Sequence, residues 1–177
     1  SPHLAIDPIL IASHIIIALQ QIVSRNTDPL KPCVLSICQI NAGEATNIIP
    51  EVVHITGTLR TVSDEWRREA QQKIIRISQN IAEAMGGKCE VTIGDGYPCT
   101  YNDPALTERT SLVAQEYMGE DKVRCLDMNM GGEDFAYYAQ KIPACFYMIG
   151  IKNELQGITS YVHTPTFNVD EKVLEIA

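Results

Sequence analysis

The chain has 177 residues, of which 45% are hydrophobic and 20% charged, as is typical of a globular protein that buries a core. Its net charge of −8 argues against nucleic-acid binding, which depends on clustered Lys and Arg. The six cysteines show no CxxC spacing, which disfavours a cysteine-based zinc site, and a chain of this size needs no disulfides, so we expect a reducing, cytoplasmic compartment.

The N-terminal stretch predicts neither a signal peptide nor a membrane span. Ser1-Pro2-His3 carries no basic region. The apolar run from Ile9 to Leu19 is interrupted by Ser13 and His14 and is shorter than a bilayer-crossing helix requires. We therefore expect no membrane partner.

Five elements are predicted in the first half of the chain. Asp7 and Pro8 indicate a helix start, because Asp accepts hydrogen bonds from free amides and Pro suits the first helical position. Alternation and β-branched residues indicate the strands. The expected elements are a helix from Pro8 through Ile22, strands over residues 34–40 and 51–61, a helix that begins at Ser63 and stops at Gly86-Gly87, and a strand over residues 89–93.

These elements follow the order helix, strand, strand, helix, strand. If one more strand preceded Ser1, the order would be β-α-β-β-α-β, the ferredoxin-like split unit. We therefore expect residues 1–98 to form a ferredoxin-like α+β module that lacks its first strand. The turn-forming segments Tyr97-Pro98 and Asn102-Asp103-Pro104 predict a domain boundary at this point.

Helices and strands alternate in residues 99–177, which indicates part of an α/β layer. This stretch is too short for a complete α/β domain, so we interpret it as the C-terminal portion of one. The expected elements are a helix over residues 104–118, a strand over 122–127, a helix over 133–140, a strand over 145–149 and a helix that starts at Asp170.

Among the histidines, His163 is the strongest candidate for a functional residue. It lies in a loop before a helix, and loops carry function more often than cores do. A loop histidine can be a metal ligand or a base, but a surface role is also open. His14 and His54 fall within a predicted helix and strand, where a packed or surface histidine is the simpler interpretation.

Two further pieces could bind a ligand. Gly131 and Gly132 precede Glu133 at an expected helix start, where free amides can hold a carboxylate, although a glycine turn with acidic capping residues is the simpler interpretation. Asn47 ends a polar loop and Arg60 ends a strand, so both could reach one ligand. The planar guanidinium of Arg suits a carboxylate, but spacing alone also fits a turn Asn and a surface Arg.

Five motifs in one order resemble the N-acyl-amino-acid amidohydrolase and hippurate hydrolase branch of the co-catalytic zinc metallopeptidases. The resemblance covers essentially the whole chain. The motifs are Ser1-Pro-His-Leu-Ala-Ile-Asp-Pro-Ile, Asn47-Ile-Ile-Pro, Gly57-Thr-Leu-Arg-Thr, Gly132-Glu-Asp-Phe-Ala-Tyr-Tyr and His163-Thr-Pro-Thr-Phe.

The resemblance implies a ferredoxin-like lid over residues 1–98, inserted into an α/β catalytic domain of which residues 99–177 are the C-terminal portion. It implies two divalent metals, zinc or else manganese, nickel or cobalt, and a metal-bound hydroxide that attacks the amide of an N-acyl amino acid. It also implies a homodimer formed through the lid, in which one subunit's lid can complete the partner's site.

The resemblance also assigns roles to individual residues. His163 matches a metal ligand, and the other ligands and the catalytic glutamate are expected upstream of Ser1. We therefore expect the chain alone to be inactive, since one ligand is not a site. The residues matched to substrate binding are Asn47, Arg60, Gly131, Gly132, Glu133 and, with a less defined role, His3.

Two alternatives remain open at this point. A non-catalytic binding or dimerisation module is compatible with a ferredoxin-like fold, which hosts many functions. The His163 loop and the Gly131-Gly132 turn would then have no evident purpose. A dipeptidase or deacylase of the same broad family is the other alternative, and the segment from Gly132 to Tyr138 favours the amidohydrolase branch.

Overall fold

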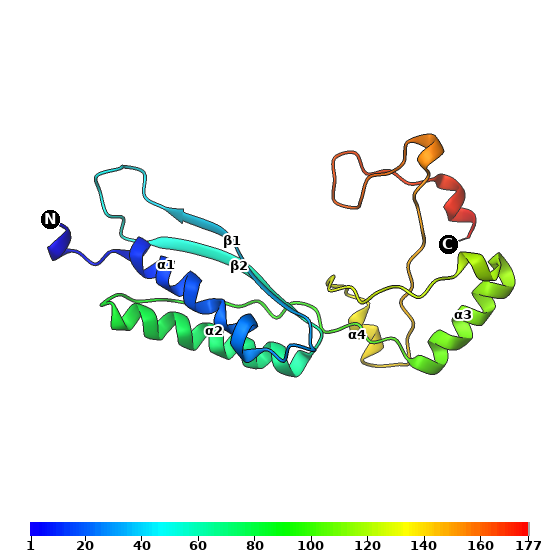
Figure 1. Cartoon of the computed structure of the whole chain (residues 1–177), viewed down its shortest axis with the longest axis horizontal. Helices are drawn as coiled ribbons and strands as arrows, with labels where there is room; N and C mark the ends of the chain where they lie inside the picture. Colours follow the sequence, from blue (N-terminus) through cyan, green and yellow to red (C-terminus); the bar gives the residue numbers. More distant parts are fainter. Residues whose placement is uncertain (177) are drawn as a thin grey trace.

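The computed structural model describes residues 1–176 and divides them between two parts (Figure 1). One part contains α1, α2 and the β1–β2 hairpin, and the other contains α3, α4 and the C-terminal loops. The elements are η1 (Pro2–Leu4), α1 (Pro8–Leu19), η2 (Ile22–Asn26), β1 (Cys33–Ala42), β2 (Val53–Thr61), α2 (Asp64–Ala84), α3 (Pro104–Met118), η3 (Glu120–Lys122), α4 (Ala136–Ala139), η4 (Glu154–Gln156) and η5 (Glu171–Glu175).

The predicted helix starts of α1 and α2 are confirmed. The Asp7 carboxylate accepts from the amides of Ile9 and Leu10, and Pro8 occupies the first helical position. Ser63 caps α2 by accepting from the Trp66 amide. Such caps satisfy amides that have no partner within the helix, so they fix where each helix begins.

The first helix continues beyond its predicted end. After Leu19 the chain passes into a π-helical turn over Ile22–Asn26, which gives 19 residues from Pro8 to Asn26 with a mean hydropathy of 1.4. By length and composition this helix could cross a membrane, so the expectation that the apolar run is too short was wrong. Its face of Ile11, Ile15, Leu19 and Ile22 is buried against α2 and the hairpin, as in a core helix of a globular protein.

β1 and β2 form an antiparallel hairpin that pairs Cys33 with Thr61 at one end and Ala42 with Val53 at the other. The register shifts between Ile37 and Gln39, opposite Gly57. A Cβ on Gly57 would overlap the Ser36 carbonyl oxygen, so only glycine allows the strands to approach so closely at this bulge.

The core lies between the two helices and one face of the hairpin. Buried residues on α1 and η2 meet Ala70 and Ala82 of α2, whose small side chains allow close helix packing. Leu35, Ile37 and Leu59 cover this core from the sheet. The opposite face of the hairpin therefore remains available for contacts outside the core.

The predicted strand over residues 89–93 does not form. This segment has no ladder hydrogen bonds, and the sheet among the described residues has two strands. In a split β-α-β-β-α-β unit, an additional central strand would supply the partner that this segment needs, and an extended chain without a partner does not become a strand. The mixed helix and sheet character is confirmed, whereas the complete ferredoxin-like topology stays a prediction.

In the C-terminal part, only the helix over residues 104–118 forms as predicted, capped by Asp103, which accepts from the Leu106 amide. The expected strands over 122–127 and 145–149 are extended but unpaired among the described residues, for the same lack of a partner. The expected helix over 133–140 shortens to Ala136–Ala139, and the one at Asp170 is the short η5.

Candidate functional site

Arg60 reaches from the end of β2 to the glycine turn of the other part. Its guanidinium donates to the carbonyl oxygen of Met130 at 2.9 Å, although the two residues are 70 positions apart in sequence. The side chain is exposed. Since a guanidinium carries five N–H donors, several remain available for a ligand carboxylate. The structure thus brings Arg60 next to the turn of Gly131 and Gly132, and their shared role in a substrate site stays a prediction.

The turn of Gly131 and Gly132 is fixed by a hydrogen bond within the turn and by packing against Tyr97. The Gly131 amide donates to the Asn129 side-chain oxygen at 2.7 Å. A Cβ on Gly132 would lie 3.2 Å from the Tyr97 ring, so Gly132 packs directly against that ring. Because the Gly131 amide is already bonded and α4 is only four residues long, the idea that free amides of a helix start hold an anion here is not supported.

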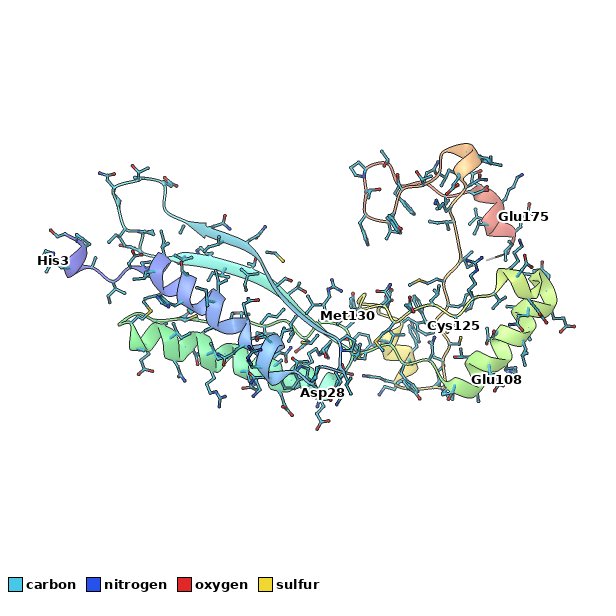
Figure 2. All side chains as sticks on the ribbon, in the orientation of Figure 1. His3, Asp28, Glu108, Cys125, Met130 and Glu175 are labelled. Carbon is cyan, nitrogen blue, oxygen red and sulfur yellow. The ribbon has the colours of Figure 1, made fainter. Side chains whose placement is uncertain are left out.

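Asn47 and His3 lie away from Arg60. Asn47 is in the exposed hairpin turn beyond the Ala42–Val53 pair, whereas Arg60 pairs with Val34 near the other end. At 3.3 Å per residue, the strand between these ends spans roughly 25 Å. In Figure 2, His3 lies at the outer end of the N-terminal part, whereas Met130, which Arg60 contacts, lies at the junction with the other part. Within one chain the hairpin therefore keeps Asn47 and Arg60 apart, and their expected roles at one ligand stay a prediction.

His163 adopts a left-handed backbone conformation, with φ of 63°. This conformation is uncommon for any residue other than glycine, and such strain often marks functional loops. Two short contacts hold the loop: Thr164 donates to the Tyr161 carbonyl at 2.8 Å, and the hydroxyls of Ser160 and Thr166 lie 2.7 Å apart. The imidazole is exposed at the tip of the loop.

The base of the His163 loop is held by Asp170. Its carboxylate accepts from the Asn153 side-chain amide at 2.6 Å and from the Lys172 amide at 3.2 Å. These hydrogen bonds stabilise the charged form, so they hold the pKa of Asp170 below its ordinary value. The loop therefore has a fixed base and an exposed tip.

Within residues 1–176, no three His, Cys, Asp or Glu side chains gather as a metal site would require. His163 offers a single donor, and two-metal sites need several. The described residues by themselves do not fit a pair of metal ions.

The sequence reading missed the polar contacts at the junction between the two parts. Asp64 and Arg67, which follow the predicted helix start at Ser63, contact the backbone of Cys99 and Tyr97. Burial, with the nearby Asp64 carboxylate, raises the pKa of the Cys99 thiol. The signal in the sequence was an acidic helix start, which is compatible with too many roles to single these residues out.

The family of the chain follows from comparison with known proteins. The model of Peptidase family M20/M25/M40 matches residues 10–177. The chain belongs to this family. The resemblance to the metallopeptidases is thereby confirmed, and the five motifs quoted above lie on a chain of that family.

Relatives of the chain include named hydrolases. The chain is 35% identical to the N-acetyl-L-cysteine deacetylase of Bacillus subtilis, over 98% of this chain and 40% of the relative. It is 34% identical to thermostable carboxypeptidase 2 of Saccharolobus solfataricus, over 99% of this chain and 44% of that protein. The chain thus spans less than half the length of these curated relatives.

A solved structure matches the fold as well as the sequence. The dinuclear metal-binding peptidase of the M20 family from Bacillus subtilis superposes with a TM-score of 0.74 at 32% identity, over 97% of this chain and 43% of that one. Its two metals are a property of that protein. The roles of His3, Asn47, Arg60, Gly131, Gly132, Glu133 and His163 stay predictions.

Proposed function

We propose that the full-length protein hydrolyses the amide bond of N-acyl amino acids with the help of two divalent metal ions. The observation that carries the proposal is the contact of Arg60 with Met130, which holds a guanidinium beside the glycine turn. An N-acyl amino acid keeps a free α-carboxylate, and the guanidinium fork is the protein group that best fits a carboxylate. The family and the deacetylase relative support this substrate class.

The two parts of the chain receive different roles in this proposal. Residues 1–98 act as a lid that presents Arg60, and residues 99–177 contribute to a catalytic domain through Gly131, Gly132, Glu133 and His163. His163 supplies one metal ligand, and the remaining ligands and the general base belong to the rest of the parent protein. The chain alone is then inactive, since it holds one donor of a site that needs several.

The proposal also concerns which acyl group the enzyme removes. A hippurate hydrolase-like preference would place a benzoyl group at the cleft, whereas the deacetylase relative acts on an acetyl group. The carboxypeptidase relative makes a peptidase the second candidate, because a peptide also ends in a free carboxylate. Arg60 would serve both substrates equally, so only the group on the other side of the scissile bond separates them.

The compartment of the proposed enzyme is the cytoplasm. All six cysteines are free thiols in the structure. Disulfides persist in oxidising compartments and are rare where thioredoxin and glutathione keep thiols reduced.

A substrate panel tests the function. The full-length protein, loaded with Zn²⁺ or Mn²⁺, is incubated with N-acetyl amino acids, hippurate and dipeptides, and the released amino acid is measured. We expect release from the N-acyl amino acids, its loss on chelation of the metal, and its return on adding metal. Release from dipeptides alone would favour the peptidase, and no release from any compound would refute both.

A further inference from the structure

The segment of residues 96–99, which joins the two parts, is fixed to the start of α2. Both carboxylate oxygens of Asp64 accept from the Cys99 amide, at 3.2 and 3.4 Å. Arg67 lies 3.2 Å from Asp64 and also donates to the Tyr97 carbonyl oxygen. These two side chains are only 26% and 21% exposed, so water screens their attraction less than at an open surface.

The other side of the same segment holds the glycine turn. The Tyr97 ring meets the Tyr137 ring edge-on, with centroids 6.1 Å apart, and the Tyr137 hydroxyl donates to the Gly96 carbonyl at 3.3 Å. Gly132 packs on the Tyr97 ring, where a Cβ would lie 3.2 Å away. Tyr97 therefore touches the turn with its ring while Arg67 holds its carbonyl.

A junction between two parts of a chain is ordinarily exposed and has few contacts. Here a charged pair is bonded to the backbone of two junction residues, and the thiol of Cys99 donates to the Thr61 carbonyl at 3.4 Å. Pro98 between them is buried. The path from α2 through Tyr97 to Gly132 is thus continuous, and each step in it is a direct contact.

We propose that Asp64 and Arg67 are positioning residues that fix residues 97–99 on α2 and thereby set the position of the Gly131–Gly132 turn relative to Arg60. Arg67 acts on the turn through Tyr97, whereas Asp64 acts through its pair with Arg67 and its bond to the Cys99 amide. The consequence for catalysis rests on the proposed function, whereas the positioning itself is a property of the structure. The matched neighbours Glu65 and Arg68 lie on the same helix turn, are exposed, and have no polar partner among the described residues.

Amide hydrogen exchange in the full-length protein tests the positioning directly. The variants are Asp64→Ala and Arg67→Met, with Glu65→Ala and Arg68→Met as controls. Asp64→Ala removes the acceptor of the Cys99 amide, so exchange at that amide should be about tenfold faster. Arg67→Met removes the donor to the Tyr97 carbonyl and the ion pair with Asp64, so exchange at Gly131 should be faster in both variants. The controls should stay at wild-type rates. Asp64→Asn, which keeps an acceptor oxygen without the charge, replaces Asp64→Ala if the latter does not fold.

Steady-state kinetics of the same variants tests whether the positioning affects catalysis. We expect kcat/KM for an N-acyl amino acid to fall about tenfold in Asp64→Ala and Arg67→Met, by the same lost hydrogen bond, at unchanged metal content. Unchanged exchange at Cys99 and Gly131 would overturn the proposal, as would faster exchange with full kcat/KM. If the wild-type protein hydrolyses no N-acyl amino acid, the proposed function fails, and exchange at these two amides alone decides the positioning.

Discussion

The guanidinium of Arg60 and the carbonyl oxygen of Met130 lie 2.9 Å apart and join the end of β2 to the turn before α4. This hydrogen bond brings a cation from one part of the molecule to a glycine turn in the other. The guanidinium uses one of its donors here and, being exposed, can turn the others toward a ligand. Under the proposed function, a substrate carboxylate would meet this chain beside this contact.

Replacing Arg60 tests whether it binds substrate. In the full-length enzyme, Arg60→Met should lower kcat/KM for N-acyl amino acids by roughly ten- to a hundredfold, the loss expected for one or two charge-assisted hydrogen bonds. Because Arg60 is exposed, the melting temperature should change little. Steady-state kinetics and thermal denaturation together measure both effects.

A matched control for Arg60 is Arg76→Met on the exposed side of α2. This control makes the same Arg-to-Met substitution at a position away from the glycine turn. We therefore expect kcat/KM to stay at the wild-type value. If Arg60→Met instead lowers the melting temperature and leaves kcat/KM intact, Arg60 serves the fold through Met130 and does not bind substrate.

Gly57 provides a test of the hairpin geometry. Gly57→Ala places a Cβ against the Ser36 carbonyl oxygen, a backbone atom that cannot move aside cheaply. We expect the free energy of unfolding to fall by about 1–3 kcal/mol, the usual cost of overpacking. Gly94→Ala is the control, since nothing lies within 4 Å of the Cβ it would add. Equal urea midpoints for the two variants would contradict the observed bulge.

Elements set by local chemistry could be predicted from the sequence. The caps at Asp7, Ser63 and Asp103 determine helix starts through contacts two or three residues away, and all three are present. Strands depend on partners distant in sequence. Residues 89–93 have the composition of a strand but no partner strand within residues 1–176, so composition alone could not predict their unpaired state.

In the candidate site, too, individual residues could be predicted from the sequence, whereas the contacts between them could not. The sequence indicates Arg60 and the Gly131-Gly132 turn as separate candidates, but the spacing of residues cannot predict a contact across 70 positions. Asn47 ends a loop and Arg60 ends a strand, which suggests that both can reach one ligand, but the hairpin places them at opposite ends. The sequence does not distinguish Asp64 and Arg67 from other residues at a helix start, because helix starts are commonly charged.

His163 is expected to be a metal ligand of the full-length enzyme. Its backbone is left-handed, and Asn tolerates that conformation well, so His163→Asn removes the imidazole with little added strain. We expect metal per subunit, measured by mass spectrometry of the metals, to fall and hydrolysis to be nearly abolished. His14→Asn, exposed on α1, should retain wild-type metal content. Full metal occupancy in His163→Asn would refute the assignment.

The exposed side of α1 is expected to form a dimer interface. Ile9, Leu10 and Ile17 are 41%, 50% and 71% exposed, and apolar side chains gathered on one helix commonly mark an interface. Light scattering of the full-length protein should give a dimer, and Ile17→Glu should shift it toward a monomer. Gln79→Glu on α2 adds the same charge at another exposed position and should leave the dimer intact. A wild-type monomer at micromolar concentration would contradict this expectation.

A dimer would also account for the separation of Asn47 from Arg60. The hairpin keeps these residues apart within one chain, so Asn47 can serve a site containing Arg60 only if it belongs to the partner's lid. Asn47→Ala and Arg60→Met should each inactivate the homodimer. Co-expression with two different tags allows purification of mixed dimers, which should regain about half of the wild-type kcat per dimer, because one of two symmetric sites is then intact. Mixed dimers as inactive as their parents would rule out a shared site.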